Sequence, residues 1–193
     1  MHATAVETYK FTAEEFVKIY EAGIFEDEDR IELVEGELII MHAIGSRHAQ
    51  TLSNLNAYFM EQAKRRFMLS PQNPVFIEEH SLPQPDIVLT PWRNRRRDHP
   101  TTEDVFLIAE ISDSSLAYDR QRKMPLYARH GVQEFWLVNL VENVIESFRN
   151  SDGEVYRDVR IWRRGERIAP EAFPDVFIDV DETIPEPFDE LLS

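Results

Sequence analysis

Two carboxylates stand in short apolar runs where a buried strand would normally exclude them. Asp86 lies in the run PDIVL at residues 85–89, and Glu110 lies in the run FLIAEIS at residues 106–112. Short runs of apolar and β-branched residues predict central strands that are buried on both faces of a sheet. An ionised carboxylate in such a place must be paired or must hold a metal ion. This conflict marks Asp86 and Glu110 as candidate functional residues.

Lys123 is the third candidate, and it lies in a helix-forming stretch after the second apolar run. If the two strands are neighbours in one sheet, Asp86, Glu110 and Lys123 can converge. Two carboxylates placed close together repel each other unless a cation lies between them. Their hard oxygen atoms favour Mg²⁺ or Mn²⁺ as that cation. Such an ion with a lysine beside it suits phosphodiester hydrolysis, because both stabilise the developing negative charge.

Each of the three residues also has a simpler structural interpretation. Asp86 could accept hydrogen bonds from backbone amides in a turn, and Glu110 could pair with an arginine. We favour metal binding for both, because each adjoins an apolar strand and each offers the other a partner. Lys123, in contrast, resembles a solvated lysine at the start of a helix when its own context is considered.

Composition favours a single globular domain. The chain has 193 residues, of which 42% are hydrophobic, and it contains no cysteine. It is therefore long enough to bury a core, and disulfides, thiolate zinc sites and thiol nucleophiles are excluded. No apolar run approaches the roughly 20 residues that span a bilayer, and the N-terminus has no signal-peptide core. We therefore expect a cytoplasmic protein.

Charge is strongly negative overall but unevenly distributed. The net charge of −15 argues against a general nucleic-acid binder, which usually presents a basic face. Residues 174–193 carry seven carboxylates and no base. Three basic clusters lie nearer the middle of the chain: Lys64, Arg65 and Arg66; Arg93, Arg95, Arg96 and Arg97; and Arg120, Arg122 and Lys123. A local anion-binding surface is therefore compatible with the acidic whole.

The N-terminal half is predicted to contain two helices and a hairpin. Thr12 and Glu15 form a capping box for a helix that runs to residue 23. The stretch 30–42 reads as two strands around a Glu-Gly turn. A long helix is predicted over residues 47–67, since its apolar positions recur every three or four residues. A strand is predicted at 75–78.

The C-terminal half is predicted to alternate strands with one helix. A basic loop at 91–104 separates the Asp86 strand from the Glu110 strand. A helix follows, beginning near residue 121 because Pro125 is tolerated only in a first turn, and ending at Gly131. A strand at 135–140 and a hairpin around a turn at 150–153 complete the pattern. We expect one domain over residues 1–193, a core at about 45–140 and an acidic extension at about 165–193.

The ordered motifs resemble a known family. They are IELVEGEL at 31–38, His48, PDIVL at 85–89, AEISDSS at 109–115, YDRQRKMPLYARHGV at 118–132 and EFWLVN at 134–139. Together they resemble the Uma-type endonucleases of the PD-(D/E)xK superfamily, long classified as a domain of unknown function. The resemblance covers roughly residues 10–165. It implies an α/β (α+β) fold with a restriction-endonuclease-like core: a mixed central sheet flanked by helices, with an added N-terminal hairpin and a β-rich C-terminal extension.

The resemblance also implies roles for particular residues. Asp86 and Glu110 would be the two acids of the motif and would bind the metal. Ser112 stands where the lysine of the motif is expected, two residues after Glu110. In the family that the chain resembles, this lysine lies instead on the following helix. The resemblance therefore implies Lys123 as the catalytic lysine. Its recurrent acid and histidine in the N-terminal half would be Glu32 or Glu35, and His48.

Several further residues are secondary candidates with structural alternatives. Asp119 is interpreted as a helix cap rather than a metal ligand, and Tyr127 as ordinary packing one turn after Lys123. His48 is more often structural in such a position, and Glu32 and Glu35 fit a solvated hairpin. Arginines suit phosphate geometry, so the predicted phosphate-binding residues are Arg93, Arg95, Arg96, Arg97, Arg120 and Arg122. For the cluster at 93–97, a solubilising loop is an equally good interpretation.

The sequence thus predicts a Mg²⁺- or Mn²⁺-dependent nuclease that acts on DNA. Asp86 and Glu110 would bind the ion, and Lys123 would assist the attacking water. Two alternatives stay open: a catalytically silent, dimeric binding module on the same fold, which the net charge of −15 favours, and a hydrolase of small phosphodiesters. A homodimer is compatible with duplex cleavage, which needs two sites.

Overall fold

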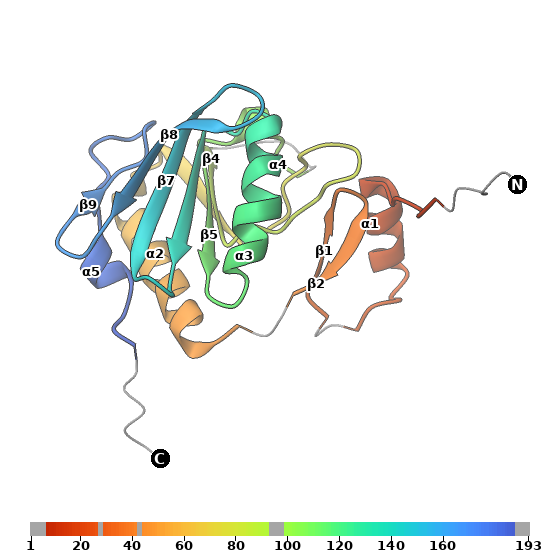
Figure 1. The fold of residues 1–193 in the computed structure, drawn as a ribbon, viewed down its shortest axis with the longest axis horizontal. Coiled ribbons are helices and arrows are strands. Elements are labelled where there is room, and N and C mark those ends of the chain that lie inside the picture. The colour runs from red at the N-terminus through yellow and green to blue at the C-terminus, as the bar shows by residue number, and fades with distance from the viewer. Residues whose placement is uncertain (1–6, 27–28, 42–43, 93–98, 188–193) are drawn as a thin grey trace, which may run out of the picture.

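A six-stranded mixed sheet forms the middle of the molecule. The computed structural model describes residues 7–26, 29–41, 44–92 and 99–187. The strand order is β3-β4-β5-β6-β7-β8 (Figure 1). The strands are Phe67–Pro71 (β3), Ile87–Pro91 (β4), Leu107–Ser112 (β5), Glu134–Asn139 (β6), Val144–Ser151 (β7) and Tyr156–Trp162 (β8). β5 and β6 are parallel, and all other neighbouring pairs are antiparallel. The predicted mixed central sheet is confirmed.

Helices cover both faces of the sheet, as the predicted fold class requires. On one face lies α2 (Ser46–Ala63). On the other lies a continuous helical stretch that joins β5 to β6, made of α3 (Leu116–Tyr118), a π-helical segment (Asp119–Lys123) and α4 (Met124–Arg129). Figure 1 shows α2 and α4 on opposite sides of the strands.

The remaining elements are short. A 3₁₀ turn precedes β5. A two-stranded ribbon and a single helical turn follow β8 and lie among the residues beyond 165. They are Thr102–Asp104 (η1), Arg167–Ile168 (β9), Ile178–Asp179 (β10) and Val180–Thr183 (α5). The central sheet continues through β7 and β8, beyond the predicted core boundary at residue 140. The division of the chain into one domain stays a prediction.

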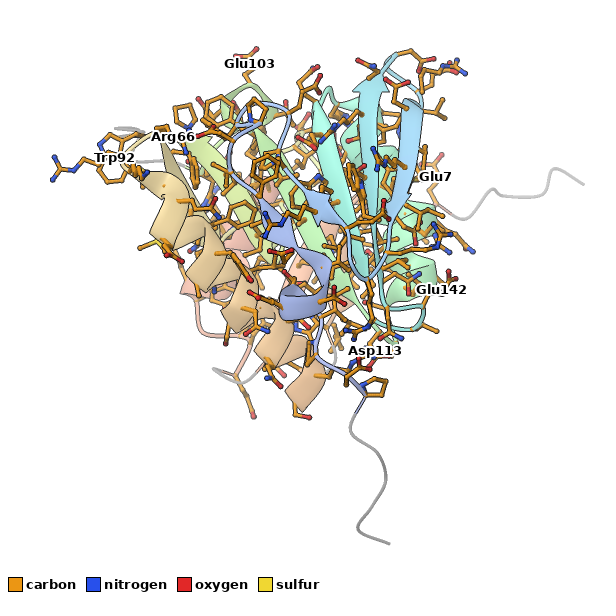
Figure 2. The ribbon with its side chains drawn as sticks, turned by 90° about the vertical axis from the view of Figure 1, so that its left-hand side faces the viewer. Glu7, Arg66, Trp92, Glu103, Asp113 and Glu142 are labelled. Atoms are coloured by element: carbon orange, nitrogen blue, oxygen red, sulfur yellow. The ribbon has the colours of Figure 1, made fainter. Side chains whose placement is uncertain are left out.

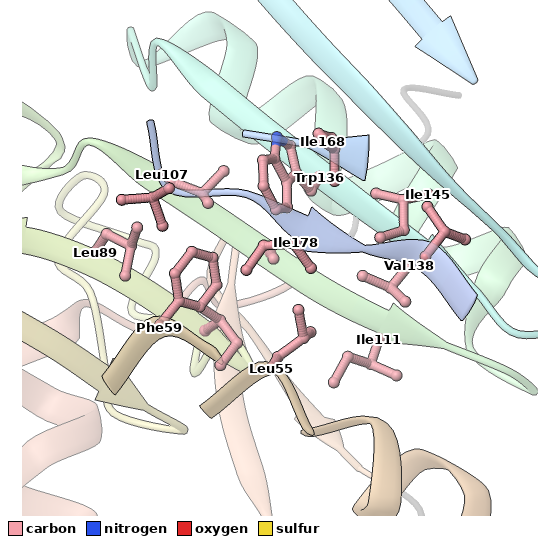
Figure 3. Close-up of a cluster of buried hydrophobic side chains, with 14 of the residues drawn as sticks. Leu55, Phe59, Leu89, Leu107, Ile111, Trp136, Val138, Ile145, Ile168 and Ile178 are labelled. Atoms are coloured by element: carbon pink, nitrogen blue, oxygen red, sulfur yellow. The ribbon is translucent and has the colours of Figure 1, made fainter. Parts of the chain in front are cut away.

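The larger core lies between α2 and the sheet. Leu55 and Phe59 of α2 are fully buried and pack against the β5 and β6 side chains shown in Figure 3, among them Ile111 and Trp136. Phe59 meets the ring of Phe67 edge-on, with 6.1 Å between ring centroids. A second core, on the opposite face, joins α4 to the other side chains of β5 and β6. Both faces of the central strands are therefore buried, as their apolar runs predicted.

An N-terminal hairpin, β1 (Ile31–Val34) and β2 (Glu37–Ile40), packs beside the sheet together with α1 (Ala13–Glu21). Both turn residues, Glu35 and Gly36, have positive φ, at 50° and 78°, as a two-residue hairpin turn with the right twist requires. A Cβ on Gly36 would lie 2.6 Å from the Lys10 Cβ, so only glycine fits there. The hairpin and the capping box of α1 are confirmed.

Three predicted boundaries are wrong. The helix predicted at 47–67 ends at Ala63, because Lys64 adopts the left-handed conformation and Phe67 is needed as a core residue of β3. Residues 75–78 do not form a strand of the sheet. Only isolated bridges form there: Phe76 pairs with Thr101, and Glu78 pairs with Ser81 across a tight reversal of the chain.

The third error concerns the helix that contains Lys123. It begins at Leu116, not near residue 121. Pro125 has no N–H to donate to the preceding turn, and it lies at the start of the regular helix α4, as expected. The chain is nevertheless already helical before it, because the π-helical turn continues the helix upstream.

We expect Phe59→Ala to lower the free energy of unfolding by about 3–5 kcal/mol, because it removes a fully buried ring and leaves a cavity. Urea unfolding measures the change. The neighbouring Met60→Ala is the matched control: its side chain is 65% exposed, so its effect should stay within about 0.5 kcal/mol. Equal effects of the two substitutions would contradict the described core.

Candidate active site

Asp86 and Glu110 lie on adjacent strands, as the proposed constellation requires. Ile87, the first residue of β4, pairs with Ala109 of β5, so Asp86 and Glu110 flank the same point of the sheet. Asp86 is 6% exposed and Glu110 is 3% exposed. The backbone N–H of Ile111 donates to Asp86 Oδ2 at 2.9 Å. The strand pairing itself therefore fixes one acid beside the other.

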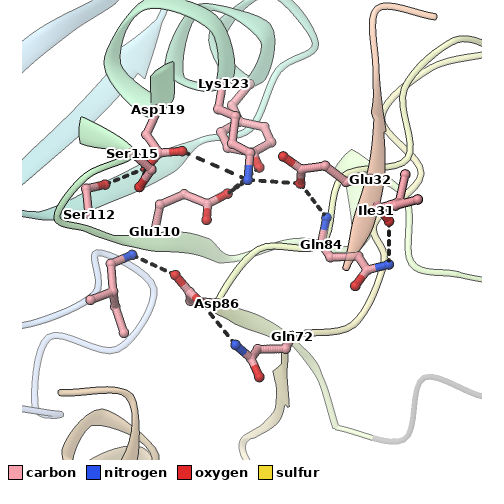
Figure 4. Close-up of polar contacts among 12 residues, drawn as sticks. Ile31, Glu32, Gln72, Gln84, Asp86, Glu110, Ser112, Ser115, Asp119 and Lys123 are labelled. Carbon is pink, nitrogen blue, oxygen red and sulfur yellow. Dashed lines mark hydrogen bonds and ion pairs between the residues drawn. The ribbon is translucent and has the colours of Figure 1, made fainter. Parts of the chain in front are cut away.

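Lys123 is fully buried and points into the same region (Figure 4). Its Nζ lies 2.9 Å from Glu32 Oε2 and 3.2 Å from Glu110 Oε1. Asp119 Oδ1, one turn earlier in the helical stretch, lies 4.0 Å away. The interpretation of Lys123 as a solvated lysine is wrong: carboxylates from β1, β5 and the π-helical segment surround its ammonium group.

Glu110 is held by a second residue of the same helical stretch. The Tyr127 hydroxyl donates to Glu110 Oε1 at 2.7 Å, so Tyr127 is more than packing. The other oxygen of Glu110 accepts no hydrogen bond from any described residue, and Glu110 lines a cavity. One carboxylate oxygen is thus fixed by protein donors, while the other is left for a ligand.

Asp86 is positioned by side chains from two further elements. His48, near the start of α2, has its Nε2 atom 3.1 Å from Asp86 Oδ2. Gln72, just after β3, donates to Asp86 Oδ1 at 3.2 Å. Contacts from α2, from the end of β3 and from β5 therefore fix the Asp86 carboxylate, and His48 makes the contact from α2.

Glu32 and Asp119 join Glu110 around Lys123, and with Asp86 they make four buried carboxylates in this region. Glu32 is 1% exposed and accepts from the Gln84 N–H at 3.2 Å, so its interpretation as part of a solvated hairpin is wrong. Asp119 does not cap a helix. It is 2% exposed and accepts hydrogen bonds at 2.7 Å from Ser112 and Ser115. One oxygen of each, Glu32 Oε1 and Asp119 Oδ1, is buried without a hydrogen-bond partner.

The two central acids have opposite electrostatic environments. Burial raises the pKa of Glu110 well above its usual range; Lys123 partly offsets this, while Asp119, Asp86 and Glu32 raise it further. Burial also acts to raise the pKa of Asp86, but His48, the Ile111 N–H and Lys123 outweigh it, and the net shift is downward. Asp86 is thus stabilised as the anion, whereas ionisation of Glu110 costs free energy in the folded protein.

Lys123 remains charged in this environment. Burial alone would lower the pKa of Lys123, but Glu110, Glu32 and Asp119 raise it well above its usual value. Burial likewise raises the pKa of Tyr127, so its hydroxyl keeps its proton. Neither side chain can accept a proton at neutral pH. Each can only donate hydrogen bonds and, for Lys123, contribute positive charge.

A cavity of about 450 Å³ opens over the carboxylates. Asp86, Glu110 and Asp119 lie at one side, with His48 beside them, and the outer wall is formed by β2 and by the residues that follow β5. Asp86, Glu110 and Asp119 therefore face a space that can admit a ligand, whereas Glu32 does not line it.

Not every predicted site residue is brought to this region. Glu35 lies in the hairpin turn and pairs with Arg122 at 2.8 Å and with Arg129 at 2.6 Å. Arg120 pairs with Glu146. Arg120 and Arg122 are therefore neutralised by carboxylates of this chain. Arg93, Arg95, Arg96 and Arg97 lie outside the described residues.

Some contacts could not be found from the sequence. Gln72 and Ser115 carry no local signal, because they are polar residues in turns. Gln84 adjoins the Pro-Asp pair, but its role depends on a backbone N–H. One usable clue was present in the sequence, which was that Ser112 stands where the motif has a lysine. In the structure the Ser112 hydroxyl donates a hydrogen bond to Asp119.

The residues fit a hard divalent cation. Among the described residues, no group of three or more His, Asp or Glu side chains is arranged as a ready metal cage. Mg²⁺, however, is commonly bound by one or two carboxylates together with water and substrate phosphates. Asp86 and Glu110 supply such a pair. A cation beside them would offset both the burial and the neighbouring carboxylates that raise the pKa of Glu110.

Comparisons with known proteins agree with this architecture. A sequence model of the Uma2 family, described as "Putative restriction endonuclease", matches residues 13–181. The chain also resembles a crystal structure of "a putative nuclease belonging to DUF820" from Anabaena variabilis, with a TM-score of 0.70 and 16% identity over 90% of this chain and 97% of that one. That likeness shows the fold. No curated protein matches the chain, and no helix in the described ranges is long and apolar enough to cross a membrane.

We expect Glu110→Gln to stabilise the metal-free protein at pH 8 by about 0.5–2 kcal/mol, as strain-relieving substitutions commonly do. The raised pKa means that folded Glu110 binds a proton more readily than the unfolded chain does. Wild type therefore loses stability as pH rises from about 4.5 through the folded-state pKa. The advantage of the variant should grow over that window.

Thermal denaturation in EDTA at pH 5 and pH 8 measures this difference. Glu142→Gln, at an exposed position, is the control and should show little change at either pH. A Glu110→Gln variant that is less stable than wild type at pH 8, or equally shifted at both pH values, would contradict the electrostatic description.

Proposed function

The chain belongs to the Uma2 family, described as "putative restriction endonuclease", and on that basis we propose that it hydrolyses phosphodiester bonds in DNA with the help of Mg²⁺ or Mn²⁺. The observation that carries the proposal is the enclosure of Lys123. A charged lysine contacts Glu110 on β5, directly beside Asp86 at the start of β4. Two acids that line a cavity, one of them in contact with a charged lysine, suit attack of water on a phosphate.

Each residue has a distinct role in this proposal. Asp86 and Glu110 bind the cation, which when present supplies Lewis-acid stabilisation of the phosphate charge. Lys123 contributes fixed positive charge to the transition state and cannot serve as the base, because its pKa is raised. Tyr127 and His48 orient the two acids. In hydrolysis the water oxygen bonds to phosphorus, the ester P–O bond breaks and the leaving oxygen takes up a proton.

Two alternative functions can be distinguished from DNA cleavage by experiment. A binding module would show no catalytic turnover, and a hydrolase of small phosphodiesters would act on small substrates but not on DNA. The net charge of −15 favours a binding module without catalytic activity, because negative charge on the protein lowers its affinity for a polyanion such as DNA. The same charge is compatible with hydrolysis of small phosphodiesters. Activity on DNA excludes the first alternative, and activity on small phosphodiesters without activity on DNA favours the second.

A homodimer belongs to the proposal as well. β8 lies at the edge of the sheet, and in the described part of the chain no strand pairs with its outer side. Val159 and Ile161 on β8 are exposed by 55% and 39%. Such an edge can pair with a second copy. Sedimentation equilibrium decides between monomer and dimer.

We expect Asp86→Asn to reduce nicking of supercoiled plasmid in Mg²⁺ or Mn²⁺ by about 100-fold or more, because it removes the charge that attracts the cation. Lys123→Met should have a similar effect on the rate. It should also cost about 3–5 kcal/mol of stability, since it leaves buried carboxylates unpaired, so circular dichroism must accompany the assay. EDTA should abolish nicking. Glu142→Gln is the control, and an active Asp86→Asn variant would disprove the mechanism.

We expect His48→Ala to lower Mn²⁺ affinity or nicking by about 10–100-fold, the usual effect of removing a residue that orients a metal ligand. His48 acts through Asp86, so an amide nitrogen at the same reach should replace it. His48→Gln is therefore expected to restore much of the loss. Isothermal titration with Mn²⁺ measures the affinity. Equal loss in both variants would indicate that His48 is needed only for packing.

A further inference from the structure

The cavity above the carboxylates has two unlike walls. On one side lie the charged groups of Asp86, Glu110 and Asp119. A second part of the lining, the apolar wall, is formed by Ile39 and Ile40 of β2 together with Met41 and Ile44. Ile40 is 71% exposed, so its side chain is accessible to a ligand in the cavity. The cavity therefore offers an apolar surface directly beside the acids.

Arg30 is the one arginine or lysine that lines this cavity among the described residues. It precedes β1, and its backbone carbonyl accepts from the Met41 N–H at 2.7 Å, which ties it to the apolar wall. Its guanidinium makes no hydrogen bond or ion pair with any described residue. By contrast, Arg122 is neutralised by Glu35 and Glu37, and Lys123 is enclosed. Arg30 is thus the cation that remains available to an anionic ligand at this site.

Tyr118 provides a further donor for a ligand. Its hydroxyl is buried without a hydrogen-bond partner, although Tyr118 lines the cavity. Burial raises the pKa of Tyr118, so the hydroxyl keeps a proton to donate. A buried hydroxyl that lacks a partner costs free energy, and a polar ligand in the cavity would supply one.

We propose that this cavity receives a single unpaired nucleotide, with its phosphate on Arg30 and the hydrogen-bonding edge of its base near Tyr118. The base lies against the apolar side chains of Ile39, Ile40, Met41 and Ile44. A cavity of about 450 Å³ has the size of a small-ligand site and cannot take in a stacked duplex. A base inside a duplex reaches such a pocket only after it leaves the stack.

The charge of the chain agrees with this substrate. A protein that grips a long duplex neutralises many phosphates with basic side chains. Here the net charge is −15, and one free arginine serves the cavity. The inference rests on the proposed nuclease function and makes it narrower: the preferred substrates are single strands and duplexes with an unpaired nucleotide.

Cleavage of four labelled DNAs of one sequence tests the substrate class: a single strand, a perfect duplex, a duplex with a one-nucleotide bulge and a duplex with a one-nucleotide overhang. We expect cleavage of the single strand, and cleavage at the bulge, to be at least about 10-fold faster than cleavage of the perfect duplex, because unstacking a paired base costs a few kcal/mol. Equal rates on all four substrates would overturn the inference while leaving the nuclease intact.

Two variants test the assigned contacts. Arg30→Gln should raise KM for the single strand about 10-fold or more, the loss expected for a charge-assisted hydrogen bond, with little change in kcat. Ile40→Asp should also raise KM, and since this side chain is exposed the fold should tolerate the change. Controls are Arg65→Gln, beyond the far end of α2, and Val141→Asp, 60% exposed and not a cavity residue. Figure 2 shows the adjacent Arg66 at the opposite end of the molecule from Asp113, which lines the cavity.

Binding of a 5′-phosphorylated trinucleotide of thymidine, measured by isothermal titration in EDTA, separates this inference from the proposed function. If the trinucleotide binds in an Arg30-dependent manner and no DNA is cleaved in Mg²⁺ or Mn²⁺, the nuclease proposal fails and the nucleotide site stands. If the trinucleotide does not bind, or binds equally to wild type and Arg30→Gln, the nucleotide site is wrong.

Discussion

The buried ammonium group of Lys123 is the interaction on which the site depends. A single lysine with no solvent exposure is retained because carboxylates from β1, β5 and the π-helical segment lie around it. A buried charge without such partners would cost several kcal/mol. The need to compensate it joins elements that are far apart in the sequence: the N-terminal hairpin through Glu32, the sheet through Glu110 and the crossover helix through Asp119.

The buried negative charge at this site exceeds the positive charge that Lys123 supplies. Three buried carboxylates lie within 4.0 Å of one lysine, and Asp86 is a fourth buried acid at the start of the adjacent strand. Glu32 Oε1 and Asp119 Oδ1 are fully buried without a hydrogen-bond partner. Burial, together with Asp119, Asp86 and Glu32, raises the pKa of Glu110 despite Lys123, whereas Asp86 is held as the anion by His48 and the Ile111 N–H. Pairs of acids with divergent pKa values are characteristic of catalytic centres. The excess negative charge is also the reason that a divalent cation would suit this site.

The helical crossover shows how local geometry serves the site. An ordinary α-helix through residues 116–129 would have to place Pro125 in its interior, where the missing N–H breaks a turn. The π-helical segment Asp119–Lys123 precedes that proline, and both of its ends point a charged side chain inward. Local widening of a helix in this way is frequent at functional sites. Tyr127, one turn later, then reaches Glu110.

The sequence by itself determined the two acids in apolar strands, the capping box and the Glu-Gly hairpin, because each depends on periodicity or on local backbone preference. The mixed central sheet and the role of Lys123 were predicted only through the family resemblance. Tertiary structure alone decided that Glu32 is buried while Glu35 pairs at the surface with Arg122 and Arg129. Only two residues lie between these two glutamates, so no local pattern distinguishes them. Their difference arises because Glu32 faces Lys123, a residue 91 positions later in the chain, across a contact that exists only once the hairpin packs against the sheet.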